Sequence, residues 1–190
     1  MTNLTQKAIL QGFEEMLGEM SFNKITVSAL ISKCEISSNT FYYHYRDIYD
    51  LLDTWLDRKR EAFFMSCHDT EDHFEKLKAF FHALKEHSKL VYHVFDSVTR
   101  ERMERYFFIS LKGLIYGYVE KNGSELGLSA DMILAFSDFC CYSFLGMTLE
   151  YVWGHMDADA DAAVDRMRPL FTGMLQILRQ EALRNEKGAP

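Results

Sequence analysis

The chain has 190 residues, of which 48% are hydrophobic and 26% charged, and its formal net charge is −7. This composition is typical of a globular protein, and it disfavours a generic polycationic coat for nucleic acid; a sequence-specific binder can still keep its positive groups on one small face. Only two prolines and ten glycines interrupt the chain, and strand signals are nearly absent. We therefore expect an all-α protein.

The sequence gives no sign of a membrane, a secretion signal or a bound cofactor. No apolar run approaches the roughly 18 residues that a membrane span needs. The first five residues show neither a basic n-region nor an apolar h-region, which favours a cytoplasmic protein. The cysteines lie in helical patterns without zinc-like spacing, and we interpret them as reduced thiols: Cys34, Cys67, Cys140 and Cys141. No cofactor and no metal are expected.

The first two helices are predicted from apolar residues that recur at helical spacing. One helix is expected from about Thr5, as its N-cap, to Met20. After a turn, a second helix is expected over Val27–Cys34. Thr26 is placed to cap that second helix, because a threonine hydroxyl can accept a backbone N–H of the first turn.

A third, short helix is expected over Ser38–Tyr45, with Ser37 as its cap. Phe41 and Tyr45 lie at i and i+4, so they can anchor one face of the helix in the core. The residues left pointing outward are Ser38, Asn39, Tyr42 and Tyr43.

The rest of the chain reads as further helices. A fourth helix is expected from about Asp47 to His68. The later helices are predicted over residues 74–88, 90–97, 100–121 and 129–156, followed by a last helix that ends near Glu186. Residues 122–128 are expected to form a loop, Ser129 to cap the helix after it, and Pro169 to kink or interrupt the last helix.

The third helix has the residue types of a helix that enters a DNA groove. Small polar side chains reach base edges, and hydroxyls and imidazole hold phosphates on either side. Residues 1–60 carry seven Lys or Arg and eight Asp or Glu, so this part of the chain is nearly neutral. Phosphate attraction should therefore be modest, and base contacts, hydroxyls, backbone amides and dimerisation must supply more of the affinity.

The spacing of residues across these helices resembles the N-terminal domain of TetR-family transcriptional regulators. The resemblance covers roughly residues 5–60 and is strongest in the segment Thr40-Phe41-Tyr42-x-His44-Tyr45. Two positions depart from the family pattern: Glu35 stands where glycine is common, and Ile48 where lysine is common. The segment 46–51, with the aromatic-rich body, looks like the subgroup that includes regulators of dihydroxyacetone kinase operons.

This resemblance implies a homodimer with a helix-turn-helix head over residues 1–47 and a larger helical body over residues 48–190, which dimerises and binds an effector. The fourth helix links the two parts. The implied function is a sequence-specific regulator on a pseudo-palindromic operator, with double-stranded DNA as partner. Bases would be approached by Ser38, Asn39 and Thr40, and phosphates held by Thr26, Ser37, Tyr42, Tyr43 and His44.

The same residues allow other interpretations. The aromatics of the third helix could be ordinary core residues, but Tyr42 and Tyr43 cannot both be buried if Phe41 and Tyr45 face inward. An enzyme is not expected, because neither Ser143 nor Cys67 has a visible base and orienting partner. A coregulator that keeps the fold and docks another protein through its body is the alternative, which the low head charge and the missing lysine keep open.

The body has tyrosines and histidines on otherwise apolar helices, and these could line a pocket for a small effector. The candidates are Tyr92, His93, Tyr106, Tyr116 and Tyr142. For each of them, helix packing or surface exposure is the simpler interpretation. A metal site from His82 with Glu86, or His87 with His93, is not expected, because no tight ligand set appears.

The helices near the C-terminus are predicted to form a subunit interface. The apolar faces of Ser129–Met156 and Ala163–Leu183 could build a four-helix dimer contact, with Phe144 and Phe171 among the buried residues. The alternative is that both helices only complete the core of a monomer.

Overall fold

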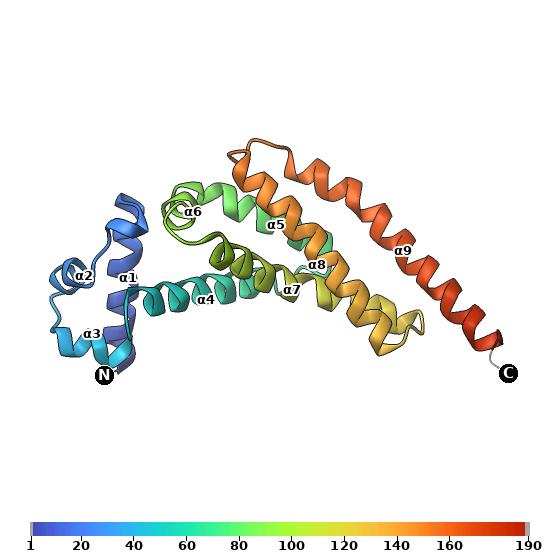
Figure 1. The fold of residues 1–190 in the computed structure, drawn as a ribbon, viewed down its shortest axis with the longest axis horizontal. Helices are drawn as coiled ribbons and strands as arrows, with labels where there is room; N and C mark the ends of the chain where they lie inside the picture. Colours follow the sequence, from blue (N-terminus) through green and yellow to red (C-terminus); the bar gives the residue numbers. More distant parts are fainter. Residues whose placement is uncertain (1, 189–190) are drawn as a thin grey trace. The chain divides into compact units, whose positions relative to one another are not determined.

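The computed structural model describes the backbone of residues 2–188 and the side chains of residues 4–184, and in this part of the chain it contains nine α-helices, one 3-10 helix and no strand (Figure 1). The all-α prediction is therefore confirmed. The elements are α1 Thr2–Glu19, η1 Phe22–Lys24, α2 Val27–Lys33, α3 Ser38–His44, α4 Ile48–Ser66, α5 His73–Glu86, α6 Ser88–Phe95, α7 Arg100–Glu125, α8 Ala130–Trp153 and α9 Ala160–Gly188.

Three predicted helix boundaries are wrong. α1 begins at Thr2, so Thr5 lies inside the helix and does not cap it. α7 extends into the predicted loop as far as Glu125, so the loop begins later than expected. α9 runs without a break past Pro169, and Val164 and Phe171, on either side of the proline, are both buried.

The contacts divide the chain into two compact units. The first unit comprises residues 1–66 and 86–103, and the second comprises residues 67–85 and 104–190. The first unit thus contains α1 to α4 and also α6, although α6 follows α5 in the sequence. The predicted domain boundary at residue 47 stays a prediction.

An aromatic cluster holds the first unit together. The Phe13 ring is fully buried in α1, and it meets the rings of Phe22 and Trp55 edge to face, each with centroids 6.2 Å apart. Such pairs add roughly 0.5–1.5 kcal/mol beyond the burial of their area. Phe22 occupies the turn between α1 and α2, so this cluster joins the helix-turn-helix segment to α1 and α4.

Within the first unit, two polar contacts join α6 and the start of α7 to α1 and α4. His93 donates from Nδ1 to the carbonyl oxygen of Leu17, 2.6 Å away. Leu17 lies in the last turn of α1, where carbonyls lack helical partners, so His93 caps this helix from a distant part of the chain. The Arg102 guanidinium lies 2.5 Å from Asp53 and 5.0 Å from the ring centroid of Tyr49, both on α4.

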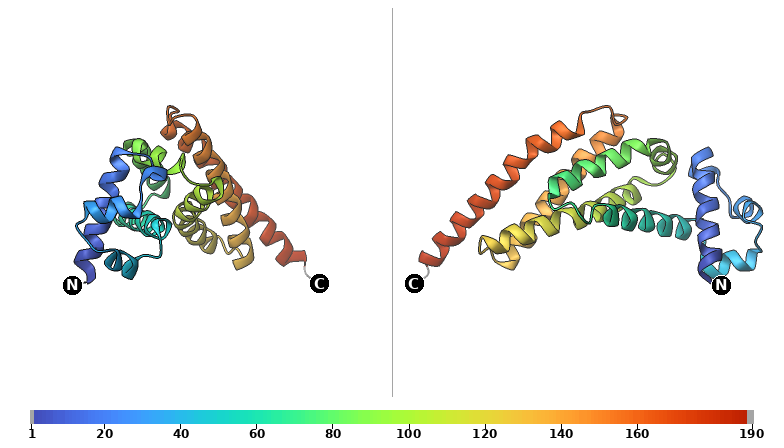
Figure 2. Two further views of the ribbon diagram at one scale, coloured as in Figure 1. Left: turned by 60° about the vertical axis from the view of Figure 1, so that its left-hand side comes forward. Right: turned by 180° about the vertical axis from the view of Figure 1, so that it is seen from behind.

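In the second unit α8 turns tightly into α9, and the two helices run antiparallel in every view (Figures 1 and 2). The turn contains two residues with positive φ, His155 at 58° and Met156 at 59°. Phe144 and Phe171 were expected in a subunit interface. They are instead buried inside the unit, with ring centroids 5.0 Å apart.

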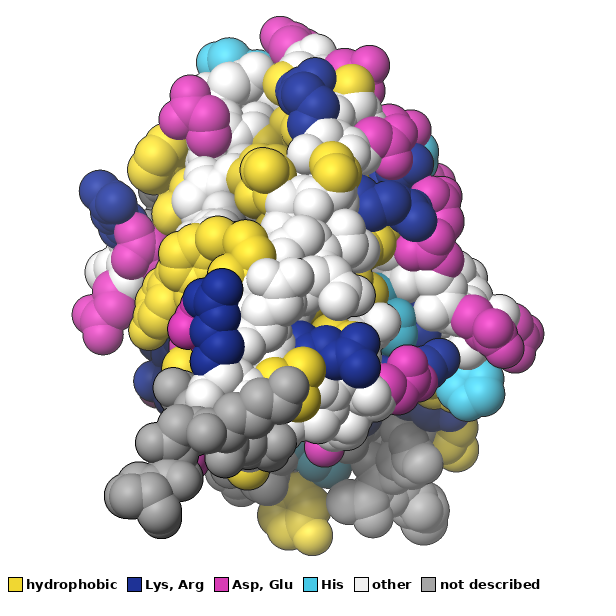
Figure 3. All heavy atoms as spheres, turned by 90° about the vertical axis from the view of Figure 1, so that its right-hand side faces the viewer, with side chains coloured by type: hydrophobic (Ala, Val, Ile, Leu, Met, Phe, Trp, Pro, Cys, Tyr) yellow, Lys and Arg dark blue, Asp and Glu magenta, His cyan; other side chains and the backbone are white. Residues whose placement is uncertain are grey.

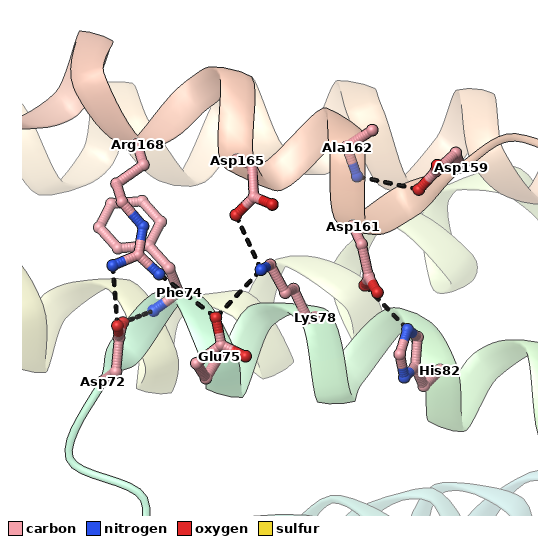
Figure 4. Close-up of polar contacts among 10 residues, drawn as sticks. All are labelled: Asp72, Phe74, Glu75, Lys78, His82, Asp159, Asp161, Ala162, Asp165 and Arg168. Carbon is pink, nitrogen blue, oxygen red and sulfur yellow. Dashed lines mark hydrogen bonds and ion pairs between the residues drawn. The ribbon is translucent and has the colours of Figure 1, made fainter.

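α5 and α9 are joined by a row of ion pairs (Figure 4). The Arg168 guanidinium spans Asp72 and Glu75 and lies over the ring of Phe74, 4.7 Å from its centroid. The remaining contacts are Lys78 with Glu75 and Asp165, and His82 with Asp161. Exposed pairs contribute little singly, but a network that fixes two helices in register contributes more.

α8 is long and apolar enough to cross a membrane, by length and composition alone. The expectation that no segment would come near this limit is therefore wrong. A core helix passes the same test when it is apolar on several sides. In α8 nine residues are buried: Phe136, Ser137, Cys140, Cys141, Phe144, Thr148, Leu149, Tyr151 and Val152.

Candidate nucleic-acid interface

Both predicted caps of the helix-turn-helix segment are present. The Thr26 hydroxyl accepts the backbone N–H of Ala29 at 3.1 Å, at the start of α2. The Ser37 hydroxyl accepts the N–H of Thr40 at 3.1 Å, at the start of α3. Each cap typically contributes about 1 kcal/mol. These two side chains thus fix where the two short helices begin.

The turn between α2 and α3 is a Schellman motif. The Ile36 N–H donates to the Ile31 carbonyl at 3.2 Å, and the Glu35 N–H donates to the Ser32 carbonyl at 3.3 Å. Glu35 has φ of 53°, the left-handed conformation that glycine adopts without strain. The tight turn is therefore kept although its residue is a glutamate, at a cost of roughly 1–2 kcal/mol.

The predicted inner and outer faces of α3 are confirmed. Phe41 is fully buried, and Tyr45 just after the helix is 2% exposed. On the other side Tyr42 is 58% exposed and Tyr43 is 76% exposed. Ser38 and Asn39 are also exposed, and Thr40 and His44 are half-buried. Two anchored aromatics therefore present a polar and aromatic face to the outside.

The outward side chains differ in whether their hydrogen-bonding groups already have a partner within the protein. Among the described side chains, the Asn39 amide and the Tyr42 and Tyr43 hydroxyls have no hydrogen-bond partner. The Ser37 and Thr40 hydroxyls lie 2.8 Å apart, so one donates to the other. The Thr26 hydroxyl accepts a bond in its capping role and keeps its own proton for another acceptor, such as a phosphate oxygen.

Carboxylates accompany several cations near this face. Lys33 lies 3.0 Å from Glu15, and Arg46 lies 3.1 Å from Asp50. The backbone N–H and guanidinium of Arg46 both bond to Asp50, and together they lower the pKa of that carboxyl. These two cations are therefore already partnered by carboxylates within the chain.

The comparisons with known proteins concern the family and the fold of the chain. Residues 71–173 match a family model described as a transcriptional regulator C-terminal region, TetR_C_8, which covers more than half of the chain. The chain belongs to the TetR family of transcriptional regulators. Among solved structures, the dihydroxyacetone kinase operon activator DhaS aligns with a TM-score of 0.65 and 16% identity, over 91% of this chain and 97% of that one. At 16% identity, this similarity shows that the two proteins share a fold. No curated protein matches.

Ile48, where the resemblance leads us to expect lysine, is half-buried at the first position of α4. An isoleucine cannot hold a phosphate. The nearest cation in the sequence is Arg46, whose side chain is 86% exposed. Lys24, which was not among the predicted contact residues, is an exposed cation in η1 with no ion pair among the described residues. Its position two residues before the Thr26 cap was the available signal.

The five effector candidates are divided between the two units. Tyr92 and His93 belong to the first unit and the other three to the second. Tyr142 is 64% exposed. The Tyr116 hydroxyl donates to Asp138, and burial and then this carboxylate raise the pKa of the tyrosine. The effector role of these residues stays a prediction.

A small apolar cavity lies elsewhere in the second unit. Its volume of about 10 Å³ is close to that of a single water molecule. Its lining residues are His73, Phe74, Leu77, Leu114, Ile115, Tyr118, Phe144 and Phe171, and none of the five candidates is among them.

Proposed function

We propose that the chain is a sequence-specific DNA-binding regulator that acts in the cytoplasm as a homodimer on a pseudo-palindromic operator. The observation that carries this proposal is the outer face of α3, where Asn39, Tyr42 and Tyr43 are exposed with unused polar groups. Such a face, held by two buried aromatics, is what a helix in the major groove requires. Residues 1–47 would bind DNA, and residues 48–190 would dimerise and respond to an effector.

Within this proposal the exposed residues form two groups, according to whether they contact the bases or the phosphates of the DNA. Ser38, Asn39 and Thr40 approach base edges. Phosphates on either side are held by Thr26, Ser37, Tyr42, Tyr43 and His44, and Lys24 joins them. Contacts to phosphate set the register and contacts to bases set the sequence.

An apolar stripe on α9 supports the homodimer. Leu170, Met174 and Ile177 recur at helical spacing and are 59%, 39% and 59% exposed. On α8, Phe139 and Trp153 are about half exposed, at 51% and 52%. Apolar side chains also reach the surface between charged groups on the side drawn in Figure 3. We propose a second copy of the chain as the partner of this stripe, as in a four-helix contact.

An effector would act by preferring one of two arrangements of the heads. The apolar cavity of the second unit is too small to hold more than water, so an effector there must first open it. An aromatic or aliphatic compound suits such a lining better than a charged one.

The alternative remains a coregulator that docks another protein through its body. The observation in its favour is the pairing of head cations with carboxylates, such as Lys33 with Glu15 at 3.0 Å. These pairs reduce the positive charge offered to phosphates.

A salt-dependent gel shift separates the two. The probe is a pseudo-palindromic duplex from the chain's own promoter region. Tyr43→Ala should weaken binding to every sequence, whereas Met65→Ala, at an equally exposed position in α4, should not. Wild-type protein that shows no sequence preference at physiological salt would favour the coregulator.

A further inference from the structure

α3 lacks the side chains that most often read guanine and cytosine. Its seven residues, Ser38–His44, include no arginine, lysine, aspartate or glutamate. Guanine is most often read by arginine or lysine through its O6 and N7 atoms, and cytosine by a carboxylate that accepts from N4. The outer face of α3 therefore offers neither reader.

The cations nearest in sequence to α3 are already engaged. Lys33 precedes the turn and is paired with Glu15 on α1. Arg46 follows the helix and is bonded to Asp50 through both its backbone and its guanidinium. Each side chain would have to leave its carboxylate before it could bond to a base.

Asn39 offers the group that suits adenine. An asparagine amide carries a donor and an acceptor side by side, which match N7 and the N6 amino group of adenine. The Asn39 side chain is exposed and has no partner among the described residues, so both groups are available. Its position on the outer face, three residues before Tyr42, directs it away from the anchored side of the helix.

Two neighbouring groups suit thymine. The Tyr42 ring is 58% exposed and rests edge to face on Phe41, with centroids 5.3 Å apart, so it presents an apolar surface in a fixed position. The Thr40 hydroxyl is turned toward Ser37, which leaves its methyl group for contact. The C5-methyl group of thymine is the apolar feature of the major groove.

We propose that α3 is an A·T reader: Asn39 bonds to an adenine edge in each half-site, and Thr40 and the ring of Tyr42 contact thymine methyl groups next to it. The hydroxyl of Tyr42, at the far end of that ring, stays available for the phosphate contact. The proposal rests on the proposed DNA-binding function and names the bases that this function would select. Guanine and cytosine are disfavoured at these positions, because their polar edges would lose water without gaining a partner.

The test begins with selection of duplexes from a random library on the full-length wild-type protein. The enriched half-site should contain A·T pairs at the positions that α3 contacts. In that duplex, 7-deazaadenine at the contacted position removes the N7 acceptor and should weaken binding roughly tenfold. Deoxyuridine in place of the neighbouring thymine removes the methyl group and should also weaken binding. 7-deazaguanine elsewhere in the half-site should have no effect.

Two variants make the assignment specific to one residue. Asn39→Ala should bind more weakly and lose its sensitivity to 7-deazaadenine. Asn39→Arg should shift selection toward guanine at that position. An enriched sequence whose binding depends on guanine N7 and not on adenine N7 would overturn the A·T reader alone. A library that yields no enriched sequence would overturn the DNA-binding function, and the A·T reader with it.

Discussion

The Sγ atom of Cys34 lies against Gly12, so close that a β-carbon on Gly12 would be 2.6 Å from it. Cys34 ends α2 and Gly12 is in the middle of α1, so the missing side chain lets the two helices approach. The cysteine is partly buried, and this burial raises the pKa of its thiol. Its role here is to pack, as a small apolar residue.

Gly12→Ala should destabilise the protein by about 1–2 kcal/mol, because overpacking outweighs the helix propensity gained. The matched control is Gly18→Ala in the same helix, where nothing lies within 4 Å of the added β-carbon; it should be neutral or stabilising. Urea unfolding measures both. The double variant Gly12→Ala with Cys34→Ala should recover much of the loss, and failure to do so would refute the steric explanation.

Glu35→Gly should stabilise the protein by about 1 kcal/mol, because glycine adopts the φ of 53° without strain. Glu35→Ala removes the same carboxylate but keeps a β-carbon, so it serves as the control and should give no such gain. The midpoint of urea unfolding compares the two. Equal effects of both substitutions would show that the charge, and not the backbone, matters at this position.

His73 should make stability depend on pH. Burial lowers the pKa of His73 in the folded protein, and Lys76 and Lys121 add to the effect. The unfolded chain therefore binds more protons as the pH falls below about 6.5, and stability decreases on going from pH 7.5 to 5.5. His73→Gln should flatten this dependence, whereas His68→Gln, at an 87% exposed side chain, should leave it unchanged. An unaltered slope in the first variant would contradict the prediction.

Met174→Glu should convert a dimer to monomer while the protomer stays folded, because a carboxylate in the apolar stripe of α9 would be buried unpaired. Thr172→Glu, also exposed on α9, should leave assembly unchanged. Phe171→Glu should instead unfold the protomer, since this ring is in the core of the second unit. Sedimentation and circular dichroism together distinguish these outcomes. A wild type that sediments as a monomer at micromolar concentration would remove the basis of the prediction.

Local rules predicted the head well. The caps at Thr26 and Ser37 and the two faces of α3 follow from spacing of a few residues, and the structure has them as expected. The predicted loop at residues 122–128 starts only after Glu125, and the predicted interruption at Pro169 is absent, because a single glycine or proline signal is weak within a long helix.

Other features needed distant contacts and could not be predicted from the sequence. The bond from His93 to the Leu17 carbonyl joins residues far apart in the chain, and nothing local indicates it. Phe144 and Phe171 fitted both a core and an interface, since two helices that are apolar on several sides do not reveal which side meets a partner.

The central claim is that the outer face of α3 reads a DNA sequence. Its most direct test is the ratio of dissociation constants for the chain's own promoter duplex and for a scrambled duplex of equal composition, measured at physiological salt. We expect tighter binding to the promoter duplex by a factor of roughly a thousand or more, and loss of most of this ratio in Asn39→Ala. A wild-type ratio near one would contradict the account.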